Sequence, residues 1–223
     1  MNYNCKQEKF LLVVSEMSIN LNDGQEIYLQ KNDEGLFEKI RIKIGWQMPY
    51  KSCNGLWFSD FFEHNYIECH AYMLMYREEM TVDHEDIISY CNSEHYSQSV
   101  RYLGKCLEDS GSVSEIMLID PEKIPEQYSM IVFMVDVSKV NGQGHHFGMI
   151  RNAYMNISDE ENTQKICHYN LSCIYDGMTS MLMGALCRCE SGWEFLAIGE
   201  GSTENIVDNL IKPDFYEESA IAI

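Results

Sequence analysis

The segment Ile40-Arg41-Ile42-Lys43-Ile44 indicates the fold class of this chain. Its isoleucines alternate with basic residues, and Lys39 continues the basic set. Successive side chains of an extended strand point to opposite faces, so the isoleucines share one face and the cations share the other. The segment therefore predicts a strand with one buried face and one solvated face.

A period of two recurs along the rest of the chain. In residues 69–76 both sets of alternating positions are largely apolar, which predicts a central strand covered on both faces. Residues 130–135 predict a buried core strand. Further strands are expected at 150–157, 165–170, 180–189 and 193–199. Turn sequences rich in Gly, Asn and Asp separate these segments. The spacing predicts an all-β fold, a β-sandwich of two antiparallel sheets.

One or two short helices are expected beside the strands. Residues 57–63 form one candidate, and residues 203–210 form the other. In the second candidate Thr203 is the expected N-cap, and Ile206, Val207 and Leu210 form one apolar stripe.

The charge of the chain limits its partners. Sixteen basic against thirty-five acidic residues give a formal net charge of -19 over 223 residues. Such a surface repels phosphate backbones and anionic lipid, so neither nucleic-acid binding nor direct membrane insertion is expected. The apolar run at residues 10–14 is also too short for a signal-peptide core or a membrane span.

Nine cysteines are scattered along the chain without the two-residue spacing of a zinc knuckle or redox motif. They are expected to be reduced thiols that pack as small hydrophobes. Together with the missing signal and span, this predicts a cytoplasmic location.

Three separated motifs carry a family resemblance. They are residues 17–25 (MSINLNDGQ), continuing to Gly45-Trp46; residues 146–154 (HFGMIRNAY); and Arg188 with residues 192–195 (GWEF) and 199–201 (GEG). Together they resemble the TerD family of tellurium-resistance and stress-response proteins. The resemblance covers residues 17–211 as one β-sandwich domain, with 1–16 as an N-terminal extension and 212–223 as a C-terminal tail.

The signature residues of this resemblance are expected to be structural. They are Gly45, Trp46, Phe147, Gly148, Arg151, Asn152, Trp193, Gly199 and Gly201. Trp46 is expected to anchor the core and to need a partner for its indole N–H. Arg151 is expected to pair with a carboxylate, and residues 199–201 are expected to form a tight turn.

The resemblance also implies a calcium site, which this chain has largely lost. Typical members supply oxygen ligands from an Asp-x-Asp entry, a Gly-Asp-Asn segment and a Gly-Asp-Asp-Glu run. These motifs align here with Tyr66-Ile67-Glu68, Gly104-Lys105-Cys106 and residues 112–115, which end at Glu115. Glu108 and Asp109 lie nearby in the sequence.

Lys105 brings a positive charge to the position of a calcium ligand, where it competes with the ion. Its ammonium is expected to fill the vacated pocket and to pair with Glu68 or Glu115. Calcium binding is then weakened or lost, and no other cofactor is expected. The alternative is a reduced calcium site built from Glu68, Glu108, Asp109 and Glu115.

No catalytic residue is predicted, because the chain lacks a Gly-x-Ser-x-Gly nucleophile elbow. Cys69-His70 and Cys167-His168 are sequence neighbours whose side chains diverge on strands. The expected function is a non-catalytic stress-response module that associates with other proteins, above all related paralogues. The alternatives are a hydrolase that uses Cys106, His70 or the acidic cluster, and metal or tellurium chemistry at the thiols, which the dispersed cysteines disfavour.

Overall fold

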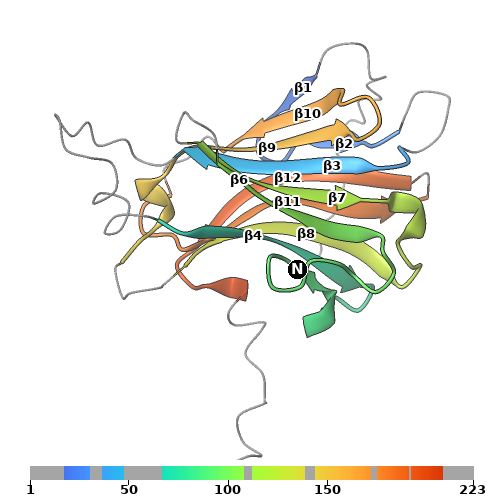
Figure 1. Ribbon diagram of the computed structural model, residues 1–223, viewed down its shortest axis with the longest axis horizontal. Helices are drawn as coiled ribbons and strands as arrows, with labels where there is room; N and C mark the ends of the chain where they lie inside the picture. Colours follow the sequence, from blue (N-terminus) through green and yellow to red (C-terminus); the bar gives the residue numbers. More distant parts are fainter. Residues whose placement is uncertain are drawn as a thin grey trace, which may run out of the picture.

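The computed structural model describes residues 18–30, 37–47, 67–107, 112–138, 144–171, 175–190 and 192–207. The first sheet contains, in spatial order, β1 (Ile19–Leu21), β10 (Lys165–Asn170), β9 (Arg151–Asp159), β3 (Ile40–Gln47), β7 (Ser112–Ile119) and β6 (Val100–Leu107). The second contains β2 (Glu26–Tyr28), β12 (Gly192–Ser202), β11 (Ser180–Cys189), β8 (Tyr128–Val137), β4 (Cys69–Arg77) and β5 (Ile87–Ile88). All neighbours pair antiparallel except β1 and β10. The two sheets stack as layers (Figure 1), which confirms the predicted β-sandwich.

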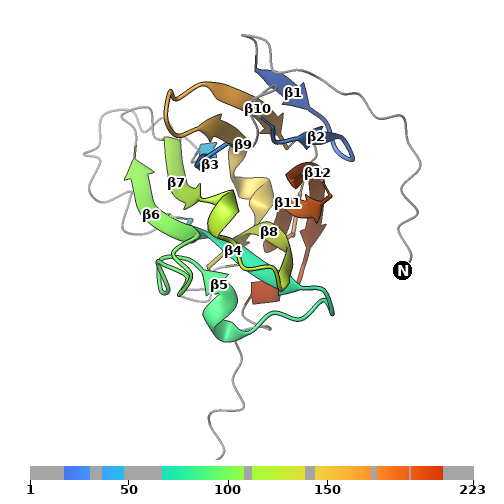
Figure 2. The same ribbon diagram turned by 90° about the vertical axis from the view of Figure 1, so that its right-hand side faces the viewer.

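The main core lies between the two sheets (Figure 2). Ile40, Ile42 and Ile44 of β3 are buried in it, whereas Arg41 and Lys43 are only half-buried on the other face. The alternation read from the sequence is thus confirmed. Short 3-10 helices lie at η2 (His84–Asp86), η3 (Pro121–Lys123) and η5 (Phe147–Met149).

A second apolar cluster covers the outer face of the second sheet. It contains Tyr72 and Leu74 of β4, together with Ile87, Val132, Met134, Ala185 and Val207. Strand β4 is therefore buried on both faces, as its composition predicts. It lies between β8 and the two-residue β5, next to the edge of the sheet rather than at its centre.

The C-terminal helix begins later than predicted. Helical backbone starts at Ile206, so Thr203 is not its N-cap. The Ile206 N–H donates to Ser180 Oγ at 2.9 Å, and the Val207 N–H donates to Asp136 Oδ2 at 3.3 Å. Side chains of the second sheet thus satisfy the first N–H groups of this helix.

Several predicted segments lie outside the described residues: the extension at 1–16, the helix at 57–63 and the tail at 212–223. In the part of the chain that is described, no helix has the length and apolarity needed to cross a membrane. Strands β6 and β7 were not predicted. Strand β6 is an edge strand whose residues beyond Val100 are mostly half-buried or exposed, so its sequence has no clear alternation.

Candidate functional site

The three segments that the resemblance aligns with calcium motifs meet where the two sheets face each other near β6, β7 and β4. Lys105 of β6 lies opposite Glu115 of β7 in the strand register. The Lys105 Nζ atom lies 3.7 Å from Glu115 Oε1 and donates to the Cys69 carbonyl at 3.2 Å. It also lies 5.8 Å from the centre of the Trp46 ring, within reach of a cation–π contact. The ammonium therefore joins the two sheets at this point.

Glu115 is the buried anion of this group. Its side chain is fully buried, and its Oε2 accepts a hydrogen bond from the Ala71 N–H at 2.8 Å. Its Oε1 accepts no hydrogen bond within the described residues, although His70 Nδ1 is also 3.7 Å away. Burial raises the pKa of the Tyr102 phenol, and the negative charge of Glu115 raises it further.

Glu68 lies beside His70, whose Nε2 is 3.3 Å from Glu68 Oε1. The His70 ring stacks on Tyr90, with 4.2 Å between ring centres. We name Glu68, His70, Lys105 and Glu115 the Glu115 cluster. Glu108 and Asp109, the other predicted ligands, lie outside the described residues.

The donors of the Glu115 cluster do not fit a calcium ion. Calcium takes six to eight oxygen ligands in most protein sites. This cluster offers two carboxylates and places an ammonium between the strands. Across the described ranges, no three His, Cys, Asp or Glu side chains are arranged to hold a metal.

Gly45 and Asn152 shape the end of the β3–β9 pair. A Cβ at Gly45 would lie 2.5 Å from the Tyr154 ring, so only glycine fits beneath that ring. Asn152 has a positive φ of 51° and donates from Nδ2 to Gln47 Oε1 at 2.7 Å, where the register shifts between Gly45 and Gln47. These signature residues therefore have structural roles.

Trp193 and Phe147 also pack in the interior. The Arg188 guanidinium lies 4.5 Å from the centre of the buried Trp193 ring. It donates to the carbonyls of Tyr128, Ile124 and Pro125 at 3.0–3.1 Å. This arginine thus links β11 to the chain segment that enters β8.

Phe147 is buried in η5, and its N–H donates to the Met178 carbonyl at 2.8 Å. A Cβ at the neighbouring Gly148 would lie 2.7 Å from Asp176 Oδ1. Both residues of the Phe-Gly pair therefore hold η5 against the turn at residues 175–178.

Three expectations for the signature residues are wrong. Trp46 is buried, but its indole N–H has no hydrogen-bond partner within the described residues. Arg151 is exposed, and among the described residues it forms no ion pair with a carboxylate. Gly199 and Gly201 lie inside β12 rather than in a tight turn. Gly199 has φ 70° where β12 carries one extra residue against β11, so it belongs to a β-bulge.

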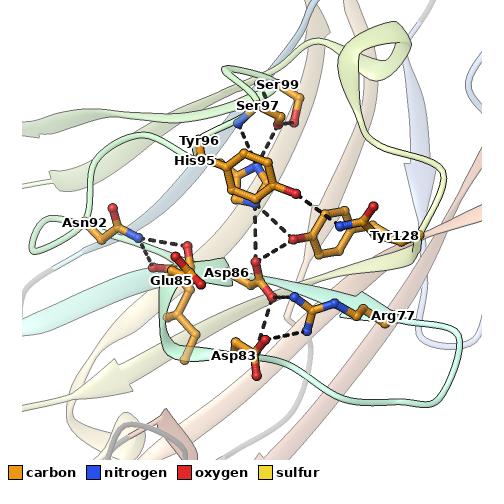
Figure 3. Close-up of polar contacts among 12 residues, drawn as sticks. Arg77, Asp83, Glu85, Asp86, Asn92, His95, Tyr96, Ser97, Ser99 and Tyr128 are labelled. Atoms are coloured by element: carbon orange, nitrogen blue, oxygen red, sulfur yellow. Dashed lines mark hydrogen bonds and ion pairs between the residues drawn. The ribbon is translucent and has the colours of Figure 1, made fainter.

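A second buried polar group, which we name the Asp86 cluster, was not predicted (Figure 3). Arg77 Nη2 lies 2.8 Å from Asp86 Oδ2, and the Tyr128 hydroxyl donates to Asp86 Oδ1 at 2.6 Å. His95 Nε2 lies 3.3 Å from the same Oδ1. The cluster connects the loop that follows β4 with strands β4 and β8. Its residues come from irregular segments and strand ends, where hydrophobic periodicity carries no signal.

Ser97 and Ser99 continue the hydrogen-bonded chain of the Asp86 cluster from His95. Ser97 Oγ lies 2.6 Å from His95 Nδ1, and Ser99 Oγ lies 2.7 Å from Ser97 Oγ. Burial lowers the pKa of His95. A serine that bonds a histidine two residues away in the same loop is typical of a local turn contact, so this order of Ser, His and Asp is no evidence of a catalytic triad.

Comparison with known proteins places the chain in a family. The TerD domain matches residues 17–212. Stress response protein SCP2 of Bacillus subtilis (strain 168) is 31% identical over 198 residues, covering 87% of this chain and 98% of that protein. Tellurium resistance protein TerD of Serratia marcescens is 24% identical over 186 residues, covering 83% of this chain and 91% of that protein.

A solved structure shares the fold. A homologue of telluride resistance protein (TerD) from Streptomyces coelicolor A3(2) superposes with a TM-score of 0.55 at 11% identity, covering 77% of this chain and 95% of that one. With a domain match over most of its length and a relative at 31% identity, this chain belongs to the TerD domain family.

Proposed function

We propose that this protein is a non-catalytic stress-response protein of the TerD family that acts by associating with other proteins. The names of its relatives support the stress-response part, since they include a stress response protein and tellurium resistance proteins. We propose related TerD-domain proteins as its partners and the cytoplasm as its location. The six cysteines in the described part of the chain are free thiols, as expected in a reducing compartment.

We further propose that Lys105 has replaced calcium in the ancestral site. The observation that carries this proposal is the position of Lys105 Nζ, 3.7 Å from the fully buried Glu115. A buried carboxylate needs a nearby positive charge, and here the chain supplies that charge itself. A divalent ion at the same place would meet the ammonium as a like charge.

The absence of catalysis is supported by the placement of the residues considered for it. Cys106 is exposed, next to the inward-pointing Lys105, whereas His70 faces Glu68 and Glu115. Burial raises the pKa of the Cys69 thiol, which disfavours a reactive thiolate there.

Calorimetric titration with calcium tests the replacement of the ion. We expect the wild-type protein to give no heat of binding at micromolar calcium, because Lys105 occupies the site. Lys105→Asp restores a carboxylate at the position where the family carries one, so this variant should gain calcium-dependent heat and a higher melting temperature in calcium than in chelator.

Lys165→Asp is the matched control, since it changes the net charge equally at an exposed position on β10. It should bind no more calcium than the wild type. Micromolar binding by the wild-type protein would overturn the proposal and favour the reduced acidic site of Glu68, Glu115, Glu108 and Asp109.

Association is tested by co-expressing the chain with the other TerD-domain proteins of its own organism and measuring complex mass by sedimentation. We expect a defined hetero-complex. Monomeric sedimentation in every mixture, together with turnover of a small-molecule substrate by the isolated chain, would show that the association proposal is wrong.

A further inference from the structure

A small polar cavity opens at the end of the first sheet where β3, β6 and β7 meet η3. Its volume is about 120 Å³, enough for several waters or one small ion. Its lining includes three cations, Lys39, Arg101 and Lys123, and two carboxylates, Glu94 and Asp120. Three cations around one small cavity are unusual for a chain whose net charge is -19.

The strand register explains why these cations gather. Arg101 of β6 lies opposite Leu118 of β7, and Leu118 lies opposite Arg41 of β3. The three side chains therefore form a row on the outer face of the sheet. Because adjacent strands are about 4.8 Å apart, the two arginines flank Leu118 with roughly 10 Å between their strands.

A second row of residues lies on the same face, two positions along each strand from the first row. The Asp120 N–H donates to the Ser99 carbonyl at 2.7 Å, and the Glu160 N–H donates to the Lys39 carbonyl at 3.1 Å. Lys39 and Asp120 thus continue the face that Arg41 and Leu118 begin. The cavity lies over these two rows.

Some of the charges at this face already have partners. Lys123 Nζ lies 2.7 Å from Asp120 Oδ2, and Arg41 forms a two-pronged pair with Glu160 at 2.5 and 2.7 Å. Hydrogen bonding to Arg41 lowers the pKa of Glu160, and the charges of Arg41, Lys39 and Arg101 lower it further. The cations thus create a local positive potential within an acidic protein.

Lys39 and Arg101 differ from these paired groups. Both are half-buried, and within the described residues neither forms an ion pair of its own. Glu94, whose backbone pairs with that of Arg101 in an isolated β-bridge, is exposed. Two cations that face one cavity and lack their own counter-ions are suited to holding an external anion.

We infer that this cavity binds a small oxyanion of the phosphate class between Lys39 and Arg101. The guanidinium fork of Arg101 can bind two oxygens of such an anion, and Lys39 adds a point charge from the start of β3, on the other side of β7. The buried Ser99 hydroxyl at the lining already contacts Ser97, so the cations provide the recognition. The size of the cavity suits one phosphate group, and its polar lining disfavours an apolar ligand.

Titration calorimetry with inorganic phosphate, against chloride at matched ionic strength, tests this site. We expect the wild-type protein to bind phosphate and the Lys39→Gln/Arg101→Gln variant to bind it at least about tenfold more weakly, because two charge-assisted contacts are lost. Arg101→Lys, which keeps the charge but loses the fork, should fall between them.

The control variant is Arg151→Gln/Lys165→Gln, which removes the same charge at exposed positions outside the cavity. It should bind phosphate within about twofold of the wild type. Circular dichroism and melting curves of all variants establish that they are folded. Equal weakening in both double variants, or no phosphate heat beyond that of chloride, would overturn the inference. So would binding of a hexaglutamate peptide at this cavity without binding of phosphate, which would identify a site for acidic protein segments.

Discussion

Two buried carboxylates of this fold, Asp86 and Glu115, have different surroundings. Arg77, Tyr128 and His95 contact the two oxygens of Asp86 at 2.6–3.3 Å. Glu115 is equally buried, yet its Oε1 accepts no hydrogen bond within the described residues. Lys105 Nζ and His70 Nδ1 each lie 3.7 Å from that oxygen.

Our proposal that Lys105 replaced calcium accounts for this difference. The partners of Asp86 come from a loop and two strands and match its oxygens in number and direction, as expected of a structural group. Lys105 approaches Glu115 without the short, directed contact of a mature ion pair. We expect this geometry if the Lys105 side chain occupies a site whose other groups are arranged for a metal ion.

The largest effect that this comparison predicts is at Asp86. Asp86→Ala leaves the Tyr128 hydroxyl without its buried acceptor and leaves Arg77 with only the exposed Asp83 as its partner, so we expect the free energy of unfolding to fall by about 3–5 kcal/mol. Urea unfolding followed by fluorescence measures it.

Asp83→Ala is the matched control for Asp86→Ala. Asp83 contacts the same Arg77 at 2.8 Å, but its side chain is 62% exposed. Its removal should therefore cost less than about 1 kcal/mol. Equal costs at the two positions would contradict the view that Asp86 is the centre of the cluster.

The sequence predicted one of these clusters and missed the other, for a physical reason. Lys105 and Glu115 occupy positions of a recognisable motif pair, so resemblance predicted that they would meet although they are ten residues apart. Asp86 and Tyr128 are forty-two residues apart in segments that match no motif. Their contact depends on how the loop before β5 folds back, which hydrophobic periodicity cannot specify.

The same limit decides which parts of the fold could be predicted from the sequence. The alternation of Ile40, Ile42 and Ile44 specified a half-buried strand and, with the other strands, the sandwich. Strand β6 could not be predicted, because an edge strand has few buried positions to impose a period. The cavity between Lys39 and Arg101 was also missed, since Lys39 precedes β3, Arg101 lies on β6, and these two strands are joined only through β7.

A smaller effect is expected at Glu115. Glu115→Gln keeps an acceptor for the Ala71 N–H and removes a charge that Lys105 meets only at a distance. We expect the free energy of unfolding to fall by about 1–2 kcal/mol, less than for Asp86→Ala. Lys105 is partly exposed, so its ammonium can turn toward water once Glu115 is neutral.

A double-mutant cycle with Lys105→Met sharpens this expectation. The double variant removes both charges and keeps the side-chain volume, so it should be close to the wild type in stability. A coupling energy as large as the loss caused by Asp86→Ala would show that Lys105 and Glu115 form a strong ion pair. The view that Lys105 only partly replaces a calcium ion would then be wrong.

The smallest effect is the pH dependence that His95 gives to the Asp86 cluster. Burial lowers the pKa of His95 in the folded protein, against the opposing influence of Asp86 and Glu85, while Arg77 lowers it further. Below the unfolded pKa of about 6.5 the unfolded chain therefore binds more protons at this position, so stability falls as the pH drops from 7 to 5, by at most about 1.4 kcal/mol per pH unit.

Burial also lowers the pKa of His168, so His95→Gln should reduce this slope without abolishing it. Urea unfolding repeated across this pH range measures the slope. A slope that is the same in His95→Gln and in the wild type would show that His95 binds protons equally in the folded and unfolded chains, and that burial does not lower its pKa.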